Sequence, residues 1–303
     1  CTFRERPTSM SSPMHVVVIG AGLGGLSSAA YLSRSGHNVT LLERDDIPGG
    51  RAGVIDSHGF RLDNGPTVLT MPGLLEDAFA AAGANMADFV TIKKVDPMYR
   101  AVYEDGSELM VRHGREAMAE EIAKFSNKVE ADSFIKFCSW LEKIYKAEMS
   151  SFIDTNYDSV LDLAKPWRDG LRLVQLGAFR RLDKSIGGFF KDDRLQRIFS
   201  FQSMYAGLAP YEALSLYAVI TYMDAVEGVF FPEGGMHAMA TGLAAAVEKA
   251  GVRIQYGSSV SRILRSSGSR GYVTGVELEN GERITCDAVV CNHDLPVAYR
   301  TLL

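Results

Sequence analysis

Three glycines at fixed spacing, Gly20, Gly22 and Gly25, carry the clearest chemical signal in this 303-residue sequence. The pattern G-x-G-x-x-G suits a dinucleotide pyrophosphate. The first glycine allows a tight turn, the second lets the backbone approach the phosphates, and the third lets a helix pack closely on a strand. Glu43 follows about twenty residues later, where an acid accepts hydrogen bonds from ribose hydroxyls and repels a 2′-phosphate. The alternative is an ordinary tight turn beside a solvated glutamate.

These residues need a strand, a turn, a helix and a second strand to position them. Residues 15–19 form an apolar, β-branched run typical of a parallel strand covered on both faces, and a helix is expected over 23–35. The amino end of that helix would direct free N–H groups at the phosphates, and Gly36 is placed to end it in a left-handed conformation. Residues 39–42 supply the second strand. This order of elements predicts a Rossmann-like α/β domain.

Two further segments favour a flavin over a nicotinamide dinucleotide. The segment PGGRA at 48–52 combines adjacent glycines with Arg51, whose planar cation can contact phosphate or flavin oxygens. The segment DNGPT at 63–67 predicts a rigid turn that presents amides and a hydroxyl. A plain nicotinamide dehydrogenase does not need this second layer, so FAD is the expected cofactor. The alternative is two surface turns with a solvated arginine.

Composition and charge narrow the classes of function. The net charge of −5 gives no reason to expect a nucleic-acid partner. The four cysteines, Cys1, Cys138, Cys286 and Cys291, show no metal spacing and no clear disulfide framework, which predicts reduced thiols in a cytoplasmic protein. No apolar run reaches the roughly eighteen residues of a transmembrane helix. Because the sequence shows no Ser-His-Asp arrangement, metal cluster or paired carboxylates, it predicts no metal and assigns no catalytic residue.

The middle of the chain has the sequence pattern of a helical domain rich in aromatic residues. Helical patterns dominate from about residue 79 to 191, with a hairpin expected over 99–111 around the Asp-Gly pair at 105–106. Between 179 and 231, 11 of 53 residues are aromatic, about twice the 10% of the whole chain. Such side chains, Phe190, Phe199, Tyr205 and Tyr211 among them, can line a hydrophobic substrate tunnel or simply form a core. We favour the tunnel for the set as a whole.

A basic stretch in the middle of the chain has two interpretations. Residues 165–184 hold six basic and two acidic side chains, in an otherwise acidic protein, together with Trp167, Leu171, Leu173, Val174, Leu176 and Phe179. Basic residues beside Trp and Leu suit a helix at the surface of an anionic membrane. An ordinary solvated helix face fits the same composition.

The carboxyl-terminal part returns to β structure. Strands are expected over 252–256, 260–263 and 287–291, and a hairpin joins 272–279 to 282–285 across Asn280-Gly281. Asn292 follows the last strand, at the edge where open α/β sheets bind ligands. The expected organisation is a disordered leader over 1–14, a first part of the FAD-binding domain over 15–95, a mixed α+β, helix-rich substrate and membrane-associated domain over 96–235, and a second, incomplete part of the FAD-binding domain over 236–303.

The motifs belong to longer blocks that run from residue 16 to the end of the chain. The blocks are GAGLGGLSSAAYLSRSGHNVTLLERDDIPGGRAG, GFRLDNGPTVLT, VDPMYRAVYEDGS, YAGLAPYEALSLYAVITYM, GVFFPEGGM and VVCNHDLPVAYRTLL. They resemble the bacterial-type phytoene desaturase family, which comprises FAD-dependent carotenoid desaturases of the flavin amine oxidase superfamily. The amino-terminal motifs are shared across that superfamily, whereas the YAGLAP and FFPEGGM blocks resemble carotenoid enzymes more narrowly.

The resemblance implies FAD-mediated removal of hydrogen from a long apolar polyene, phytoene toward lycopene, with oxygen or a quinone as electron acceptor. It also implies peripheral membrane contact, and a homo-oligomer is a further expectation. The implied FAD-binding residues are Gly20, Ala21, Gly22, Leu23, Gly24, Gly25, Glu43, Arg44, Gly50, Arg51, Ala52, Gly65, Pro66, Thr67, Val68, Val260 and Asn292. The substrate-binding candidates are Phe231, Gly234, Gly235, Tyr205 and Tyr211.

Several other functions stay open. Within the superfamily these are a carotenoid isomerase, a ketolase-like oxidase, a shorter-polyene desaturase and an amine oxidase. A flavin-less prenyl-binding protein on the same fold is a different class, and the intact glycine turn, Glu43 and the GGRA segment argue against it. Family members continue beyond the position of Leu303 and contribute another flavin-contacting segment there. We therefore expect this chain to be a fragment with weak FAD retention and little turnover.

Overall fold

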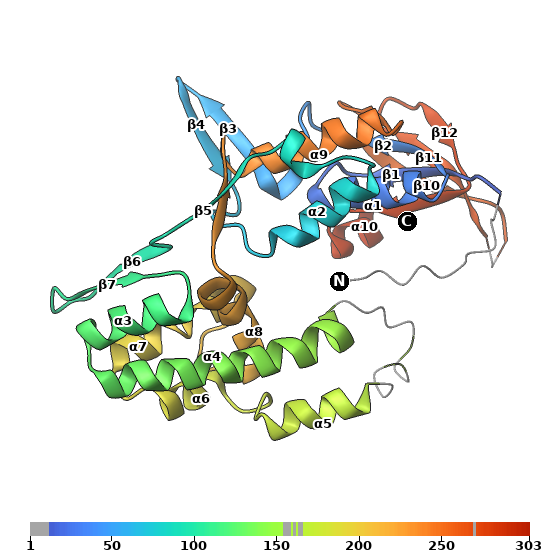
Figure 1. Ribbon diagram of the computed structural model, residues 1–303. Coiled ribbons are helices and arrows are strands. Elements are labelled where there is room, and N and C mark those ends of the chain that lie inside the picture. Colours follow the sequence, from blue (N-terminus) through green and yellow to red (C-terminus); the bar gives the residue numbers. More distant parts are fainter. Residues whose placement is uncertain (1–11, 154–158, 160–161, 163–165, 269–270) are drawn as a thin grey trace. The chain divides into compact units, whose positions relative to one another are not determined.

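The chain divides into two compact units, seen in a computed structural model that describes residues 12–153, 159, 162, 166–268 and 271–303 (Figure 1). Unit 1 comprises Cys1–Lys93 and Phe231–Leu303, and unit 2 comprises Lys94–Phe230. The sequence-based boundaries are 95/96 and 235/236. Residues 1–11 of the expected leader lie outside the described residues. The chain leaves unit 1 along β5 (Ile92–Lys94) and returns along β8 (Phe230–Pro232).

Unit 1 is built on a four-stranded parallel sheet in the order β13-β1-β2-β9. The strands are β1 (His15–Ile19), β2 (Asn38–Leu42), β9 (Arg253–Gln255) and β13 (Ala288–Cys291). Helix α1 (Leu23–Arg34) connects β1 to β2, and Gly36 follows it with a φ of +84°. The parallel sheet and this β–α–β unit confirm the predicted Rossmann-like α/β fold, with element ends that differ from the expected ones by one or two residues.

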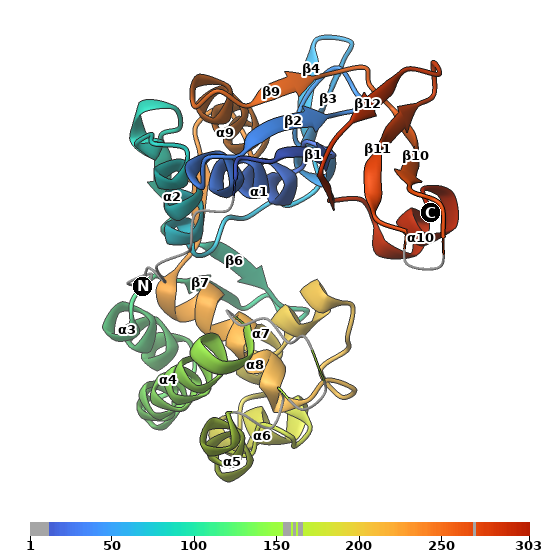
Figure 2. The same cartoon turned by 90° about the vertical axis from the view of Figure 1, so that its right-hand side faces the viewer.

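Alternate side chains of β1 face two different layers, which explains why the whole strand is apolar. Val17 and Ile19 pack in one cluster with Val276, Leu278 and Leu302. These partners come from an antiparallel sheet of β10 (Val260–Arg265), β11 (Val273–Leu278) and β12 (Arg283–Thr285), and from the end of α10 (Leu295–Thr301). The other face of the parallel sheet is covered by α1, which packs in turn against α9 (His237–Lys249) and α2 (Pro72–Ala81) (Figure 2). The pairing of β11 with β12 confirms the predicted hairpin across Asn280-Gly281.

A short hairpin follows the second glycine segment of unit 1. The 3-10 helix η1 (Gly50–Ala52) leads into β3 (Gly53–Ser57) and β4 (Phe60–Asn64), and the 3-10 helix η2 (Met86–Asp88) precedes β5. The Asp63 carboxylate at the end of β4 accepts hydrogen bonds from the backbone N–H groups of Met236 and His237, at 2.9 and 3.1 Å. A carboxylate at this place caps the amino end of α9 and ties the hairpin to that helix.

Unit 2 begins with a hairpin and continues as helices. Its elements are β6 (Tyr99–Val102), β7 (Glu108–Val111), α3 (Arg115–Phe125), α4 (Lys128–Glu148), the π-helix η3 (Met149–Ile153), α5 (Trp167–Gln175), α6 (Leu182–Phe189), α7 (Asp193–Ile198), the 3-10 helices η5 (Phe201–Ala206) and η6 (Ser215–Tyr217), α8 (Ala218–Thr221) and the π-helix η7 (Tyr222–Glu227). The pairing of β6 with β7 confirms the predicted hairpin. No helix in the described ranges is both long and apolar enough to cross a bilayer.

The core of unit 2 is aromatic. The ring of Phe137 on α4 lies 5.3 Å from those of Phe189 and Phe190 and 5.6 Å from that of Phe199. Phe137, Phe190 and Phe199 are fully buried. Phe190 and Phe199 are therefore core side chains that pack against α4 and against each other. Tyr205, in contrast, is exposed.

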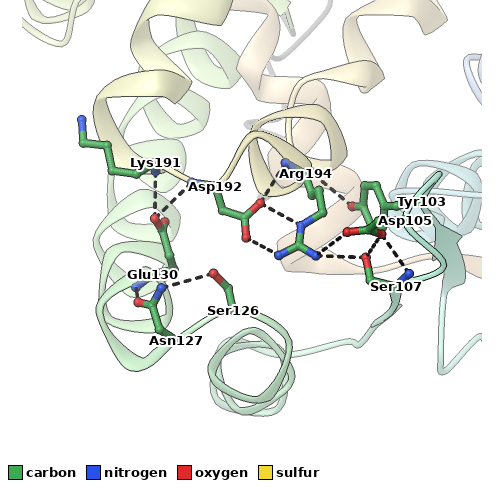
Figure 3. A network of polar contacts seen from close by, with 9 residues as sticks. All are labelled: Tyr103, Asp105, Ser107, Ser126, Asn127, Glu130, Lys191, Asp192 and Arg194. Atoms are coloured by element: carbon green, nitrogen blue, oxygen red, sulfur yellow. Dashed lines mark hydrogen bonds and ion pairs between the residues drawn. The ribbon is translucent and has the colours of Figure 1, made fainter.

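A polar network joins three chain segments at one end of unit 2 (Figure 3). The Arg194 guanidinium donates to Asp192 at 2.7 and 3.0 Å, to Ser107 at 3.0 Å and to Asp105 at 3.3 Å, and its cation lies 4.2 Å from the centre of the Phe125 ring. Buried Glu130 accepts from the backbone N–H of Asp192 at 3.2 Å. The network thus fastens the turn of the β6–β7 hairpin and the start of α4 to the start of α7.

Candidate cofactor site

A cavity of about 1040 Å³ opens in unit 1 at the carboxyl ends of β1, β2 and β13. This is the edge where parallel α/β sheets bind ligands, and the volume lies at the upper end of ordinary small-molecule sites, about 300–1,000 Å³. Of the residues expected from the sequence to bind FAD, those that line the cavity are Gly20, Gly22, Leu23, Glu43, Arg44, Gly50, Arg51, Ala52, Pro66, Val260 and Asn292. Segments from both ends of the sequence therefore meet at one site.

The glycine turn after β1 is built by close backbone approach. Gly20 has a φ of +97°, and a side chain at Gly25 would overlap with the carbonyl oxygen of Gly20. The side chain of Asn292, from the end of β13, lies over the same turn. A Cβ atom at Gly24 would be 2.7 Å from Asn292 Oδ1, and one at Gly22 would be 3.1 Å from Nδ2. Each glycine of the GLGG run therefore has a steric neighbour. A Cβ atom at Gly25 would meet the turn itself, and one at Gly22 or Gly24 would meet the Asn292 side chain.

Glu43 is a buried wall residue rather than a solvated charge. Its Oε2 accepts a hydrogen bond from the Ala21 N–H at 2.6 Å, and its Oε1 accepts one from the Asp45 N–H at 3.0 Å. The backbone of Glu43 is also fixed, because Ser258 N–H donates to its carbonyl at 2.7 Å. Each carboxylate oxygen retains a free lone pair, so Glu43 can still accept from a ligand hydroxyl.

The PGGRA segment lies against the glycine turn. The Gly49 N–H donates to the Ala21 carbonyl at 2.8 Å, and Gly22 and Gly49 form a parallel β-bridge. Gly65, with a φ of +142°, lies so close to Arg51 that a side chain would overlap with the Arg51 carbonyl oxygen. These contacts explain why the GAGLGG, PGGRA and DNGPT segments need their glycines, since the three segments are stacked backbone on backbone.

Arg51 has a partner that the sequence did not reveal. Its guanidinium forms an ion pair with Asp294 at 3.0 Å, and both side chains are largely exposed. Further cavity residues that sequence reasoning missed include Asp45, Ser258, Ser259, Ser261, Glu279, His293, Asp294, Leu295, Thr301 and Leu302. Several follow β9 or β13 directly, so the rule that ligands bind at the carboxyl ends of parallel strands could have found Ser258, His293 and Asp294.

Other predicted residues do not line this cavity. Ala21, Gly24 and Gly25 belong to the turn after β1 and the start of α1, and Gly65, Thr67 and Val68 follow β4. Among the substrate candidates, Gly235 lies in unit 1, where a Cβ atom would be 2.8 Å from the Asp63 carboxylate oxygens, so the α9 cap explains this glycine. Phe231 and Gly234 also lie in unit 1, whereas Tyr205 and Tyr211 lie exposed in unit 2.

The cavity fits the adenosine and pyrophosphate part of a dinucleotide. The first turn of α1 starts at the glycine turn, carries no acidic residue, and leaves its first N–H groups without intrahelical acceptors. Such a helix end attracts phosphate. The glycines leave room for a close approach, Glu43 offers an acceptor, and Arg51 offers a cation.

Comparison with known proteins agrees with this geometry. A family model described as flavin containing amine oxidoreductase matches residues 23–303. The chain therefore belongs to the flavin-containing amine oxidoreductase family. A solved structure of putrescine oxidase with bound putrescine matches with a TM-score of 0.62 and 15% identity, over 96% of this chain and 60% of that one. At this identity the likeness concerns the fold, and it agrees with the α/β architecture described above.

Similar proteins identify the group within this family to which the chain belongs. It is 52% identical over 288 residues to a phytoene dehydrogenase of Streptomyces griseus, covering 95% of this chain and 56% of that protein. It is 36% identical over 291 residues to a zeta-carotene-forming phytoene desaturase of Myxococcus xanthus, covering 95% and 55%. These matches put it in the phytoene desaturase and dehydrogenase group of the family. The chain spans about half the length of these relatives.

Proposed function

We propose that unit 1 binds FAD, with the adenosine and pyrophosphate part of the cofactor in the cavity at the ends of β1, β2 and β13. The amino end of α1 and the Gly22 backbone would hold the pyrophosphate. Glu43 would accept from the ribose hydroxyls, and Arg51 would exchange its ion pair with Asp294 for a contact with the anionic cofactor. FAD, when bound, supplies a hydride acceptor that no side chain can replace.

We further propose that the substrate is a long apolar polyene, phytoene in the first instance, which is desaturated toward lycopene. The observation that carries this proposal is the 52% identity, over 95% of the chain, to a protein named phytoene dehydrogenase. The proposed substrate contacts are those that the family resemblance implies, Phe231, Gly234, Gly235, Tyr205 and Tyr211. Because the neighbouring alkene can stabilise developing positive charge, the chain needs to supply binding and orientation rather than a strong base.

The reaction implies further partners. Reoxidation of the flavin requires an electron acceptor, for which we propose oxygen or a quinone. The polyene is a lipid-soluble molecule, so we propose a cytoplasmic protein that contacts the membrane from one side and takes its substrate from the bilayer.

Expression in a host that accumulates phytoene tests the proposed reaction. The chain should be produced alone and joined to the part of the Streptomyces griseus relative that it does not match. A new pigment with a longer conjugated system, formed by the fusion and lost in a Gly25→Ala version of it, would support the proposal. Unchanged phytoene, beside a fusion protein that is folded and carries FAD, would refute it and favour another carotenoid or amine substrate.

A further inference from the structure

Helix α5 (Trp167–Gln175) exposes an apolar stripe to the solvent. Trp167, Leu171 and Val174 are 62%, 51% and 59% exposed. Their spacing of four and three residues puts them on one face of the helix. Phe179, in the turn that follows, is likewise exposed. In both views α5 lies at the outer edge of unit 2, beside α4 (Figures 1 and 2). Large apolar side chains side by side on a surface helix mark an interaction surface.

A different face of α5 anchors the helix to its unit. Leu173 is buried in a cluster with Ile144 and Ala147 of α4 and with Ala178. The indole N–H of Trp140 donates to the carbonyl of Leu176 at 2.9 Å and so holds the end of the helix. The exposed stripe is therefore not the result of a loosely attached helix. It is a second apolar face, and in the described part of the chain nothing buries it.

Cationic side chains border the stripe. Arg168 and Arg172 follow Trp167 and Leu171 in sequence, and both arginines are exposed. The helix carries one acidic residue, Asp169, so its net charge is positive. The Arg168 guanidinium lies 5.4 Å from the centre of the Trp167 ring. Arginine and tryptophan in this arrangement suit the headgroup level of a bilayer, where the ring and alkyl carbons are buried and the cation meets lipid phosphate.

We propose that α5 and the following turn dock on an anionic lipid bilayer, with Trp167, Leu171, Val174 and Phe179 in the interfacial layer and with Arg168 and Arg172 on lipid phosphates. A stripe on one nine-residue helix is small beside the ~800 Å² per partner of a stable protein interface. The local excess of basic residues complements an anionic surface in a protein whose net charge is −5. The inference deepens the proposed function, because a bilayer is the source of an apolar polyene, and its test requires no turnover.

The chain supplies its own reporter for the test. It contains two tryptophans, Trp140 and Trp167, so Trp140→Phe leaves Trp167 as the single indole. Emission of this variant should be recorded with vesicles of phosphatidylcholine and phosphatidylserine, with and without bromine on the acyl chains. Docking predicts a shift to shorter wavelength and quenching by the brominated lipid. Unchanged emission at saturating lipid overturns the proposal. If Trp140→Phe does not fold, sedimentation of the unmodified chain with the same vesicles replaces the reporter.

Variants separate lipid docking from other causes. Arg168→Gln and Arg172→Gln should each weaken binding to phosphatidylserine vesicles about fivefold at moderate salt. The pair Leu171→Ser and Val174→Ser should weaken it about tenfold or more. Val129→Ser, at a 74% exposed position on α4, is the matched control and should leave binding unchanged. Equal binding by all variants, or concentration-dependent self-association that only the stripe variants abolish, refutes the lipid surface. If the unmodified chain does not bind the vesicles while the fusion protein still desaturates phytoene, this surface alone is refuted and the proposed function stands.

Discussion

The Glu43 carboxylate accepts a hydrogen bond from the Ala21 backbone N–H at 2.6 Å and thereby fastens the end of β2 to the turn after β1. Its other oxygen accepts from the Asp45 N–H, so both oxygens shape the cavity wall before any ligand enters. Glu43 is thus a positioning residue for the glycine turn, and its proposed contact with ribose is a second role. This arrangement pre-organises the site, which lowers the cost of binding.

The first prediction concerns this contact. In Glu43→Gln an amide NH₂ faces the backbone N–H of either Ala21 or Asp45. Two donors cannot pair, so one charge-assisted hydrogen bond is lost. We expect the free energy of unfolding to fall by about 2 kcal/mol and the dissociation constant of FAD to rise at least roughly tenfold. Thermal unfolding and quenching of flavin fluorescence measure the two effects. Glu76→Gln, at an exposed position on α2, is the control and should change neither. An unchanged unfolding temperature in Glu43→Gln would contradict the positioning role of Glu43.

The second prediction uses two adjacent helical glycines. Alanine at either position gains about 1 kcal/mol of helix propensity. At Gly25 the new Cβ meets the backbone oxygen of Gly20, which cannot move without opening the turn. At Gly24 it meets only the exposed Asn292 side chain, which can rotate away. We expect Gly25→Ala to lower the free energy of unfolding by about 3 kcal/mol or more, and Gly24→Ala to change it by less than about 1 kcal/mol. Equal effects in chemical denaturation would contradict this account of the turn.

A third prediction concerns pH and the end of α4. Glu148 is buried, its Oε1 has no hydrogen-bond partner among the described residues, and burial raises its pKa to about 8. The unfolded chain ionises this group near its ordinary pKa of about 4.3, so the native state loses stability as pH rises from there to about 8. Glu148→Gln should therefore stabilise the protein by on the order of 2 kcal/mol at pH 7 and by little at pH 4. A loss of stability in Glu148→Gln at pH 7 would show instead that Glu148 is ionised and paired.

The fourth prediction concerns the network in Figure 3. Hydrogen bonding to Arg194 lowers the pKa of Asp192 to about 2. This pair stabilises the folded state above the ordinary pKa of aspartate, about 3.9, and the contribution is lost as pH falls through about 2. Arg194→Gln should lower the unfolding temperature by several degrees at pH 7 and move acid unfolding to higher pH. Arg197→Gln, which breaks the exposed pair with Asp193 on the same helix, should have almost no effect. Equal shifts in both variants would mean that only net charge matters.

The sequence predicted best those features that local chemistry decides. Gly36 follows α1, and Gly106 and Gly281 lie in the two hairpin turns. All three have positive φ values, which glycine adopts most easily, so the residue type alone predicts these turns. The β-branched run at 15–19 is a buried parallel strand for an equally local reason. These features were enough to predict the Rossmann-like fold.

What the sequence could not decide depends on distant packing. Phe199 and Tyr205 belong to the same aromatic stretch, yet α4 buries the first and leaves the second exposed. Asp294 reaches Arg51 only because β13 pairs with β1, a contact between residues more than 200 positions apart in sequence. Likewise, a Cβ atom at Gly24 would meet the side chain of Asn292, which comes from the end of β13. Composition describes none of these contacts, since each arises when two remote elements meet.

Titration of the 303-residue chain with FAD, FMN and NAD, followed by fluorescence and by the shift in unfolding temperature, tests the central claim most directly. A cavity made for the adenosine and pyrophosphate part of FAD predicts saturable binding of FAD. It also predicts weaker binding of FMN, which lacks the adenosine, and loss of FAD binding in Gly25→Ala. FMN binding as tight as that of FAD, or a complete absence of FAD binding by the folded chain, would contradict the account.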